Sequence, residues 1–525
     1  MRIYTGTFLV AFTTLALEVT LTRVFSVITW YHLSFFAIAT ALLGMTAGAV
    51  VVYLVPQWFT ERIADRTVAR ACLAFAGTIL LALITISLVP VIVTRSIMPA
   101  LSLLLLTAVS ALPFFFSGIA VTALLTKYTI PIGRLYASDL IGAATGSLFV
   151  LIGLLVFSAP SLIILCSALA VVASLIFGWK HSSRTGHRLM IMLALCIMVI
   201  AVVNSATIYG IRPLFFKGNF VAPSDLYLEK WNSFSQVSIF KENQVSPFYW
   251  GASPLAPKDI TVSEHKMRID GEAGTRLQSF SSFDDIDFLR YDVTNIGYYL
   301  RSQGAALIIG AGGGRDVQSA LLFGHRPVVG VDVNPVFIDL LQNDFRDFAG
   351  LANRDDVKLV VDEGRSFAAT TSDTFSIIEM SLIDTWAATG AGAFSLSENS
   401  LYTVEAWQTF LDRLTDDGIF TVSRWYNPSD LGETGRVVSL ALAALLERGA
   451  SNPAQHLAMV TTDRISTLLV SKNPFTPQDI VTLRQATDDL QFQLVMAPGI
   501  EPKEAFLKNL HAVKSLEELK AAIAG

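Results

Sequence analysis

Residues 305–316 read AALIIGAGGGRD, a buried-strand pattern that runs directly into a glycine-rich loop containing Gly310, Gly312, Gly313 and Gly314. A loop of this kind between a parallel strand and a helix lets backbone N–H groups approach a nucleotide closely, and the helix N-terminus adds a favourable dipole. Asp332 follows 22 residues after Gly310, at the end of the apolar run PVVGVD. An acid at that point accepts hydrogen bonds from ribose hydroxyls. The spacing therefore predicts a nucleotide-type site.

The segments after this loop alternate between strand-like and helix-like patterns. Apolar strand runs with helical patterns between them lie at 305–310, 327–333, 357–362, 375–381 and 418–425. Strands buried on both faces, with helices between them, are typical of a parallel α/β sheet. Two further runs, 457–462 and 466–472, predict a closing antiparallel hairpin. We therefore expect a doubly wound, Rossmann-like sheet over residues 301–475.

The flanking segments complete the expected domain organisation. The runs at 234–241 and 260–271 predict a small β-meander, within a linker region at 209–300. Residues 476–525 are expected to form a C-terminal helical extension. Ligands of open α/β sheets bind outside the carboxyl ends of the strands. Polar groups stand at four such ends, namely the 310–316 loop, Asp332, the 362–364 turn and the 381–384 segment.

Residues 1–208 predict a helical membrane domain. Seven apolar stretches are long enough to cross a bilayer, near 5–27, 32–55, 71–94, 98–125, 137–157, 160–178 and 188–208. The excess of Lys and Arg on the N-terminal side places the N-terminus in the cytoplasm and, after seven spans, the C-terminal domain outside. A nucleotide-type loop predicts the opposite side, because such cofactors are kept in the cytoplasm. The sequence thus indicates a multi-pass protein of the cell (inner) membrane and leaves the side of its soluble domain open.

Charge is divided unevenly along the chain. Residues 1–208 hold 11 Lys and Arg and 4 Asp and Glu, which leaves 27 basic and 39 acidic residues after position 208. An acidic second half argues against nucleic acid as a partner, since nucleic-acid binding normally needs a basic face. The three cysteines lie in apolar segments and the seven histidines are scattered, so no metal site is expected. The sequence leaves open whether the chain forms a homodimer.

Two charges fall inside the first predicted span. Glu18 and Arg23 are five residues apart, about 140° around a helix, so they do not simply face each other. Charges within a membrane are usually paired or functional. The two interpretations are a polar vestibule under the soluble domain and packing or snorkelling side chains. In the fifth span, Gly142 and Gly146 form a small-xxx-small pair that predicts close helix packing.

Several runs together resemble a known family. LIIGAGGGRD (307–316), GVDVNP (330–335), VVDEGRSF (360–367), FSIIEMSLID (375–384) and SENSLYTVEAW (397–407) are similar to the spermidine synthase (polyamine aminopropyltransferase) family, a branch of the S-adenosylmethionine-dependent methyltransferase fold. The resemblance covers about 230–430, and membrane-fused bacterial members share this layout. It implies S-adenosylmethionine or its decarboxylated form as co-substrate.

The resemblance also implies roles for individual residues in holding the cofactor. Gly310, Gly312 and Gly314 would cradle the amino-acid part of the cofactor, with Asp316 close by in the same loop. Asp332 would hold the ribose. Glu363, or Asp362, followed by Gly364, would take the adenine amine. Gln236 falls near the sulfonium side, and Asp270 with Gly271 matches the family's Asp-Gly hairpin.

Departures from the family pattern concern the acceptor side. Ser381 stands where the family has its catalytic acid, and a serine hydroxyl is far too weak a base to replace it at neutral pH. Gly313 stands at the place of the family's glycine-loop Asp. Asp384 is therefore the acid expected to accept a proton from the amine or to anchor the ammonium, with Asp292 as the second candidate. Tyr291, Ser381, Trp386 and Tyr402 are expected at the substrate or at the lid of residues 385–396.

Three functions remain compatible with the sequence. The first is an aminopropyl transferase using decarboxylated S-adenosylmethionine and an altered amine acceptor. The second is a methyltransferase that uses S-adenosylmethionine and modifies a membrane-borne acceptor. The third is a non-catalytic sensor or transporter accessory that binds a nucleoside. The motif resemblance favours the first, whereas the loss of the acid at Ser381 favours the other two.

Overall fold

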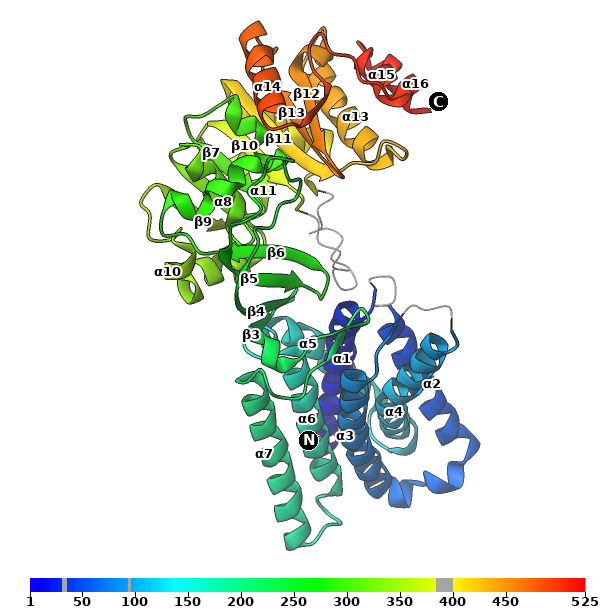
Figure 1. Cartoon of the computed structure of the whole chain (residues 1–525). Helices are drawn as coiled ribbons and strands as arrows, with labels where there is room; N and C mark the ends of the chain where they lie inside the picture. Colours follow the sequence, from blue (N-terminus) through cyan, green and yellow to red (C-terminus); the bar gives the residue numbers. More distant parts are fainter. Residues whose placement is uncertain (31–34, 93–95, 234, 384–399, 525) are drawn as a thin grey trace. The chain divides into compact units, whose positions relative to one another are not determined.

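The computed structural model describes residues 1–525 except 31–34, 93–95, 234, 384–399 and 525, and its contacts divide the chain into two units (Figure 1). Of the described residues, unit 1 comprises Met1–Lys241 and Arg268–Ala273, and unit 2 comprises the remainder. The membrane domain expected at 1–208 thus belongs to a unit that extends further along the chain and also includes one β-hairpin turn.

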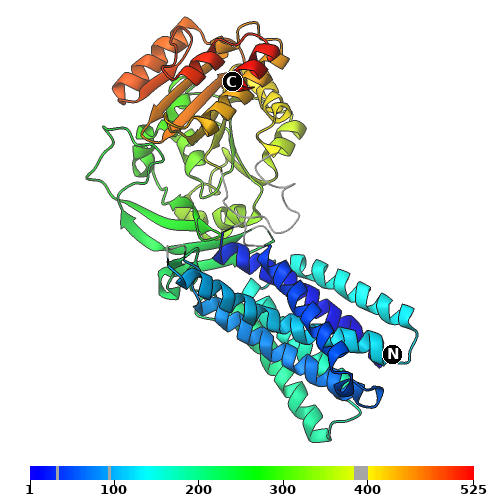
Figure 2. The same cartoon turned by 90° about the vertical axis from the view of Figure 1, so that its right-hand side faces the viewer.

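Unit 1 contains seven helices that are long and apolar enough to cross a membrane within the described part of the chain, which agrees with the predicted number of spans. They run alongside one another in both Figure 1 and Figure 2. They are α1 (Arg2–Ile28), α2 (Phe36–Leu54), α3 (Ala64–Leu88), α4 (Met98–Lys127), α5 (Ile132–Gly153), α6 (Ala159–Gly178) and α7 (Arg184–Ser205).

Small residues bring these helices into backbone contact. A Cβ atom placed on Gly142 or on Gly146 of α5 would lie 2.3 Å from a carbonyl oxygen of α1, that of Phe8 or Phe12 respectively. Any larger residue would push the two helices apart. The small-xxx-small pair is therefore a helix-packing feature, as predicted.

Short strands follow the helices in unit 1. They are β1 (Phe215–Phe216), β2 (Asn219–Phe220), β3 (Leu226–Trp231) and the first half of β4 (Gln236–Val245). A four-stranded sheet has the order β3-β4-β5-β6, with β5 at Val262–Ile269 and β6 at Ala273–Gln278. This sheet corresponds to the predicted meander.

Unit 2 contains an eight-stranded sheet of order β14-β12-β13-β11-β10-β7-β8-β9. β7 (Ala306–Ile309) pairs in parallel with β8 (Val328–Asp332) and β10 (Phe375–Ser381), and the parallel region continues to β9 (Val357–Val361) and β11 (Leu414–Trp425). β12 (Leu457–Thr462) and β13 (Ile465–Ser471) form the predicted antiparallel hairpin. The chain order of the parallel strands is that of a doubly wound sheet with its switch point between β7 and β10, so the predicted Rossmann-like methyltransferase fold is confirmed.

Helices cover both faces of this sheet. α11 (Gly364–Thr370), α12 (Val404–Asp412) and α13 (Gly432–Glu447) pack on one face through a core that includes Trp407 and Phe410. The opposite face packs against the 3₁₀ helix η6 (Val293–Tyr299) and α14 (Pro477–Asp489). The remaining helices of the sheet domain are α8 (Arg315–Leu322), α9 (Pro335–Asp339), α10 (Arg346–Ala349), α15 (Ala505–His511) and α16 (Leu516–Ala524). The C-terminal segment also contributes a strand, β14 (Gln493–Met496), which pairs with β12.

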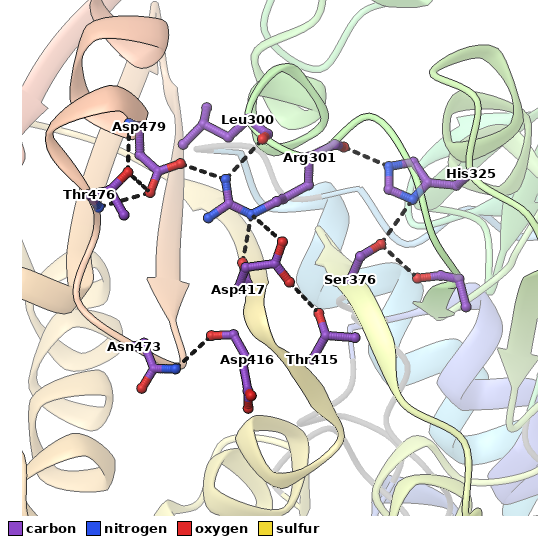
Figure 3. A network of polar contacts seen from close by, with 11 residues as sticks. Leu300, Arg301, His325, Ser376, Thr415, Asp416, Asp417, Asn473, Thr476 and Asp479 are labelled. Atoms are coloured by element: carbon purple, nitrogen blue, oxygen red, sulfur yellow. Dashed lines mark hydrogen bonds and ion pairs between the residues drawn. The ribbon is translucent and has the colours of Figure 1, made fainter.

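A polar network joins the amino ends of several strands (Figure 3). Arg301 donates to the carboxylate of Asp479 and to the carbonyl of Asp417, both at 2.6 Å. The other oxygen of Asp479 accepts the N–H and the hydroxyl of Thr476 at 2.8 Å. His325 contacts the carbonyl of Arg301 at 2.7 Å and the hydroxyl of Ser376 at 3.3 Å. The charges in this network are paired, and it lies at the edge of the sheet opposite the carboxyl ends.

Candidate active site

The glycine loop connects β7 to α8 at the carboxyl edge of the sheet. Gly310, Gly312 and Gly314 have φ angles of 84°, 49° and 87°, in the left-handed region that favours glycine. Gly313 is required for a different reason, because a Cβ atom there would lie 2.1 Å from the carbonyl oxygen of Arg276. From Gly310 to Gly314 the loop's one side chain is the buried methyl group of Ala311, and position 313 has no room for an acid.

Asp332 ends β8 directly beside this loop. One carboxylate oxygen accepts the N–H of Gly312 and the other accepts the N–H of Asn334, each at 2.8 Å. The residue is 8% exposed. Burial raises the pKa of Asp332 from 3.8 to about 6, although the two N–H donors oppose that shift. Each oxygen keeps a second lone pair, so the group has unused capacity to accept hydroxyl protons.

Glu363 and Gly364 stand after β9, at the start of α11. The Glu363 carboxylate caps the helix by accepting the N–H groups of Arg365 at 3.1 Å and Ser366 at 2.9 Å. Ser400 also donates to it at 3.3 Å. A Cβ atom on Gly364 would lie 2.6 Å from the side chain of Ile309, so a larger residue there would collide with β7. These two residues thus occupy the carboxyl edge, as the strand order requires.

The end of β10 carries Ser381, whose hydroxyl is buried and has no hydrogen-bond partner among the described residues. The next residue, Leu382, has a φ of 46°, which is uncommon for a residue other than glycine and costs about 1–3 kcal/mol. The strand therefore ends in a strained turn. Asp384, Trp386 and the whole of the expected lid at 385–396 lie outside the described residues, so their roles remain predictions.

Asp292 is fully buried at the start of η6 and is heavily hydrogen-bonded. Its carboxylate accepts the N–H groups of Trp250, Gly251 and Thr294 and the Thr294 hydroxyl, at 2.8–3.2 Å. It also forms an ion pair with Arg315 of α8 at 2.5 Å. The side chain holds η6 and α8 together.

A second group of acids extends inward from this ion pair. Arg315 also contacts Asp316 at 3.3 Å, and burial raises the pKa of Asp316 to about 6 even though Arg315 lowers it. Glu379, in the middle of β10, is fully buried and accepts the hydroxyl of Tyr298. Burial and the neighbouring Asp316 raise the pKa of Glu379 well above its usual value. Sequence reasoning missed Glu379 and Tyr298; the signal was a lone acid within the apolar run FSIIEMS.

Of the aromatic residues expected at the substrate or the lid, Tyr291 and Tyr402 lie among the described residues. Tyr402 receives a hydrogen bond from Arg424 at 3.0 Å, and the guanidinium stacks over its ring at 5.0 Å. Tyr291 packs against the apolar cluster beneath η6, and its carbonyl accepts the N–H of Ser253 at 2.8 Å. Among the described residues, no group of three or more His, Cys, Asp or Glu side chains is arranged to hold a metal ion.

Gln236 belongs to unit 1 and is part of a separate buried network. Its amide donates to Glu229 at 2.9 Å and to Ser238 at 2.6 Å. Its backbone N–H donates to Asp270 at 2.7 Å. Asp270 is also paired with Arg23 of α1, and both side chains are buried. Arg23, the basic residue predicted inside the first span, is thus paired with Asp270 of the Asp270-Gly271 hairpin turn.

Solved structures similar to this chain include spermidine synthases and methyltransferases. The spermidine synthase of Thermotoga maritima is 14% identical over 49% of this chain and 75% of its own, with a TM-score of 0.33. A probable spermidine synthase from Corynebacterium glutamicum is 14% identical over 56% of this chain and 96% of its own, with a TM-score of 0.34. Human methyltransferase-like protein 13, solved in complex with SAH, is 17% identical over 38% of this chain and 89% of its own, with a TM-score of 0.28.

Comparison with models of protein families and with curated proteins finds no match. The strand order and the contacts of the carboxyl edge therefore carry the functional interpretation, and these low-scoring likenesses do not.

Proposed function

We propose that this chain is a membrane-bound transferase that moves an aminopropyl group from a decarboxylated S-adenosylmethionine-type sulfonium to an amine acceptor. The observation that carries the proposal is Asp332, a nearly buried acid fixed by Gly312 and Asn334 beside a glycine-rich loop. This arrangement suits the diol and backbone-facing parts of a nucleoside. The seven apolar helices support a multi-pass membrane protein.

The residues at the carboxyl edge fit an adenosyl ligand. Asp332 would accept the two ribose hydroxyls with its free lone pairs. The loop at 310–314 would lie along the chain that leaves the ribose, and Gly312 is its most open glycine, because the nearest atom to a Cβ placed there would be 3.4 Å away. Glu363, which already accepts two backbone N–H groups, or Asp362 would receive the adenine amine.

The acceptor amine must reach the reacting carbon as a neutral nucleophile. The bound sulfonium supplies an alkyl carbon activated by a thioether leaving group, so most of the catalysis comes from positioning and from charge placement. We assign proton acceptance to Asp384, since Ser381 is not a base. Asp292 is assigned a positioning role, because its carboxylate joins η6 to α8 and to the backbone at Trp250 and Gly251.

Methyl transfer from S-adenosylmethionine is the second candidate. It is favoured by Gly313, where the carbonyl of Arg276 leaves no room for an acid to face an aminopropyl ammonium. It is also favoured by Ser381, which removes the base that an amine acceptor requires. Such an enzyme would act on an acceptor held in or near the bilayer.

Calorimetry on the full-length protein in detergent tests the proposal. We expect decarboxylated S-adenosylmethionine to bind more tightly than S-adenosylmethionine, and the reverse order would favour the methyltransferase. Absence of binding by both sulfonium compounds and by their nucleoside products would refute both candidates.

The role of Asp384 is tested by an isosteric change. Asp384→Asn is expected to abolish turnover while leaving cofactor affinity unchanged, and retained turnover would remove this residue from the mechanism. A reporter fused to the C-terminus would establish on which side of the membrane the soluble domain lies.

A further inference from the structure

The face of the sheet below Ser381 carries buried polar atoms that have no partner. Glu379 and Ser381 alternate with Ile378 and Met380 along β10, so they point to the face that packs against η6. Thr421 of β11 is in register with Glu379 and therefore lies beside it. Oε1 of Glu379 and the hydroxyls of Ser381 and Thr421 have no hydrogen-bond partner in the part of the chain that the structure describes. Three neighbouring orphan atoms are unusual, because buried polar groups are normally satisfied.

The same region has more acids than cations. Arg315 is the guanidinium at its centre, and its charge is matched by the fully hydrogen-bonded Asp292. Asp316 contacts the same arginine at 3.3 Å, and one oxygen of Glu379 accepts the hydroxyl of Tyr298. Glu264 of β5 and Arg276 of β6 form an ion pair with each other at 2.9 Å, so Arg276 adds no unmatched positive charge. The cluster is therefore short of positive charge.

The network at the opposite edge of the sheet shows what a purely structural arrangement looks like in this domain. There Asp479 has an arginine on one oxygen and two donors from Thr476 on the other (Figure 3). No buried side-chain atom of Arg301, Asp479 or Ser376 lacks a partner. The described residues thus complete their hydrogen bonds in this network at one edge of the sheet and leave three buried polar atoms without partners beside two acids at the other, so a ligand rich in N–H donors would satisfy them.

We propose that Asp316 and Glu379, together with Ser381 and Thr421, bind a primary ammonium group of the ligand. This inference rests on the proposed function and deepens it, because it assigns the amine-recognition site to residues within α8, β10 and β11. Position 313 has no room for an acidic side chain. In this proposal Asp316 of α8 and Glu379 of β10 provide the carboxyl groups instead. An ammonium has three donors, which match one carboxylate oxygen and two hydroxyls.

The protonation of the two acids gives the inference a direct signature. Burial and the neighbouring Asp316 raise the pKa of Glu379 well above its usual value, so Glu379 holds a proton at neutral pH that a bound cation would displace. Burial raises the pKa of Asp316 to about 6, so this carboxyl is mostly ionised at pH 7 and is ready to accept an ammonium. Arg315, Tyr298, Asp292, Glu264 and Arg276 are the other titratable groups around them. Binding of an ammonium ligand is therefore expected to release a proton, whereas binding of an uncharged nucleoside is not.

The test is calorimetry on the full-length protein at pH 7 in two buffers that differ in ionisation enthalpy. The probes are 5′-methylthioadenosine, which has no ammonium, decarboxylated S-adenosylmethionine, and 1,4-diaminobutane added after the nucleoside. We expect no proton release with the nucleoside and up to one proton released per ammonium bound. Proton release with decarboxylated S-adenosylmethionine would show that the bound ammonium belongs to the transferred chain. Release with 1,4-diaminobutane would show that it belongs to the acceptor. Equal proton counts for all three probes would overturn the inference.

Variants provide the second measurement. Glu379→Gln is expected to weaken binding of the ammonium ligand at least tenfold and to change the affinity for 5′-methylthioadenosine less than twofold. Asp316→Asn serves if the first variant fails to fold. The control is Asp479→Asn, a partly buried and hydrogen-bonded acid at the other edge of the sheet, which should change neither affinity. Unchanged ammonium affinity in a folded Glu379→Gln protein would overturn the inference. If the wild-type protein does not bind 5′-methylthioadenosine, the proposed function is contradicted. Binding of 1,4-diaminobutane would still test the role of Asp316 and Glu379 in that case.

Discussion

Replacing Asp332 by Asn should separate ligand binding from stability. The carboxylate accepts two backbone N–H groups with its two oxygens. An asparagine has one carbonyl oxygen, so one of those N–H groups would face an amide NH₂ and lose its acceptor. The substitution keeps the size of the side chain and removes its negative charge, so its effects can be assigned to the charge and to the lost acceptor oxygen.

The two effects on stability nearly cancel. The pKa of Asp332 is raised from 3.8 to about 6, so keeping the buried group ionised costs the folded state about 3 kcal/mol at neutral pH. Because the folded pKa lies above the unfolded one, this cost disappears as the pH falls from about 6 towards 3.8. Asp332→Asn removes the cost but leaves one N–H unsatisfied, which costs about 1–3 kcal/mol. We expect the free energy of unfolding at pH 7 to change by less than about 2 kcal/mol.

Ligand affinity should change much more. Loss of one hydrogen bond to a charged acceptor costs about 1.5–3 kcal/mol, which weakens nucleoside binding about 10- to 150-fold. Only the ionised carboxylate can accept both hydroxyl protons. The affinity of the wild-type protein should therefore fall about tenfold per pH unit below pH 6, and that of the variant should not depend on pH in this range.

Calorimetry with 5′-methylthioadenosine between pH 5 and pH 8 measures both quantities. A 2′,3′-dideoxy analogue is the matched control, because wild type and variant should bind it equally. Wild-type affinity in the variant, or a pH dependence that survives the substitution, would refute the assignment of Asp332 to the ribose.

The other predictions concern packing and charge pairs. Gly313→Ala should lower stability by about 1–3 kcal/mol and weaken nucleoside binding, since the new carbon would lie 2.1 Å from a backbone oxygen; Gly432→Ala, with its nearest atom at 3.4 Å, is the control in thermal unfolding. Arg23→Gln should cost about 3–5 kcal/mol by stranding the buried carboxylate of Asp270, and the double variant with Asp270→Asn should recover part of that loss. Arg301→Gln should cost about 1.5–3 kcal/mol and leave nucleoside affinity unchanged; a change in affinity would show that its network reaches the site.

The parts of the fold that could be predicted from sequence depend on local patterns. Apolar runs of strand length identified the parallel strands, and hydrophobic stretches of sufficient length identified the seven helices. Once the sheet is known to be parallel, the carboxyl ends of its strands must meet at one edge. This is why Asp332 and Glu363 could be expected at a common edge with the glycine loop from their order alone.

What could not be predicted depends on pairing between distant segments. Asp292 looks like a candidate base in sequence, but its role depends on Arg315, which lies 23 residues later. Arg23 and Asp270 are 247 residues apart, so neither pattern indicates the other. Glu379 was missed because an acid inside an apolar strand gives no period or spacing, and its meaning appears only when the neighbouring strand and helix are in place.

The hairpin turn Arg268–Ala273 has a consequence for how the protein can be divided into fragments. It belongs by its contacts to the helical unit, while the residues on either side of it belong to the sheet unit. A single cut of the polypeptide therefore cannot divide the chain into its two units. Truncation after Lys241 would also remove Asp270 and leave the buried guanidinium of Arg23 without its carboxylate. Residues 1–241 alone are for that reason expected to be less stable than the same unit in the full chain.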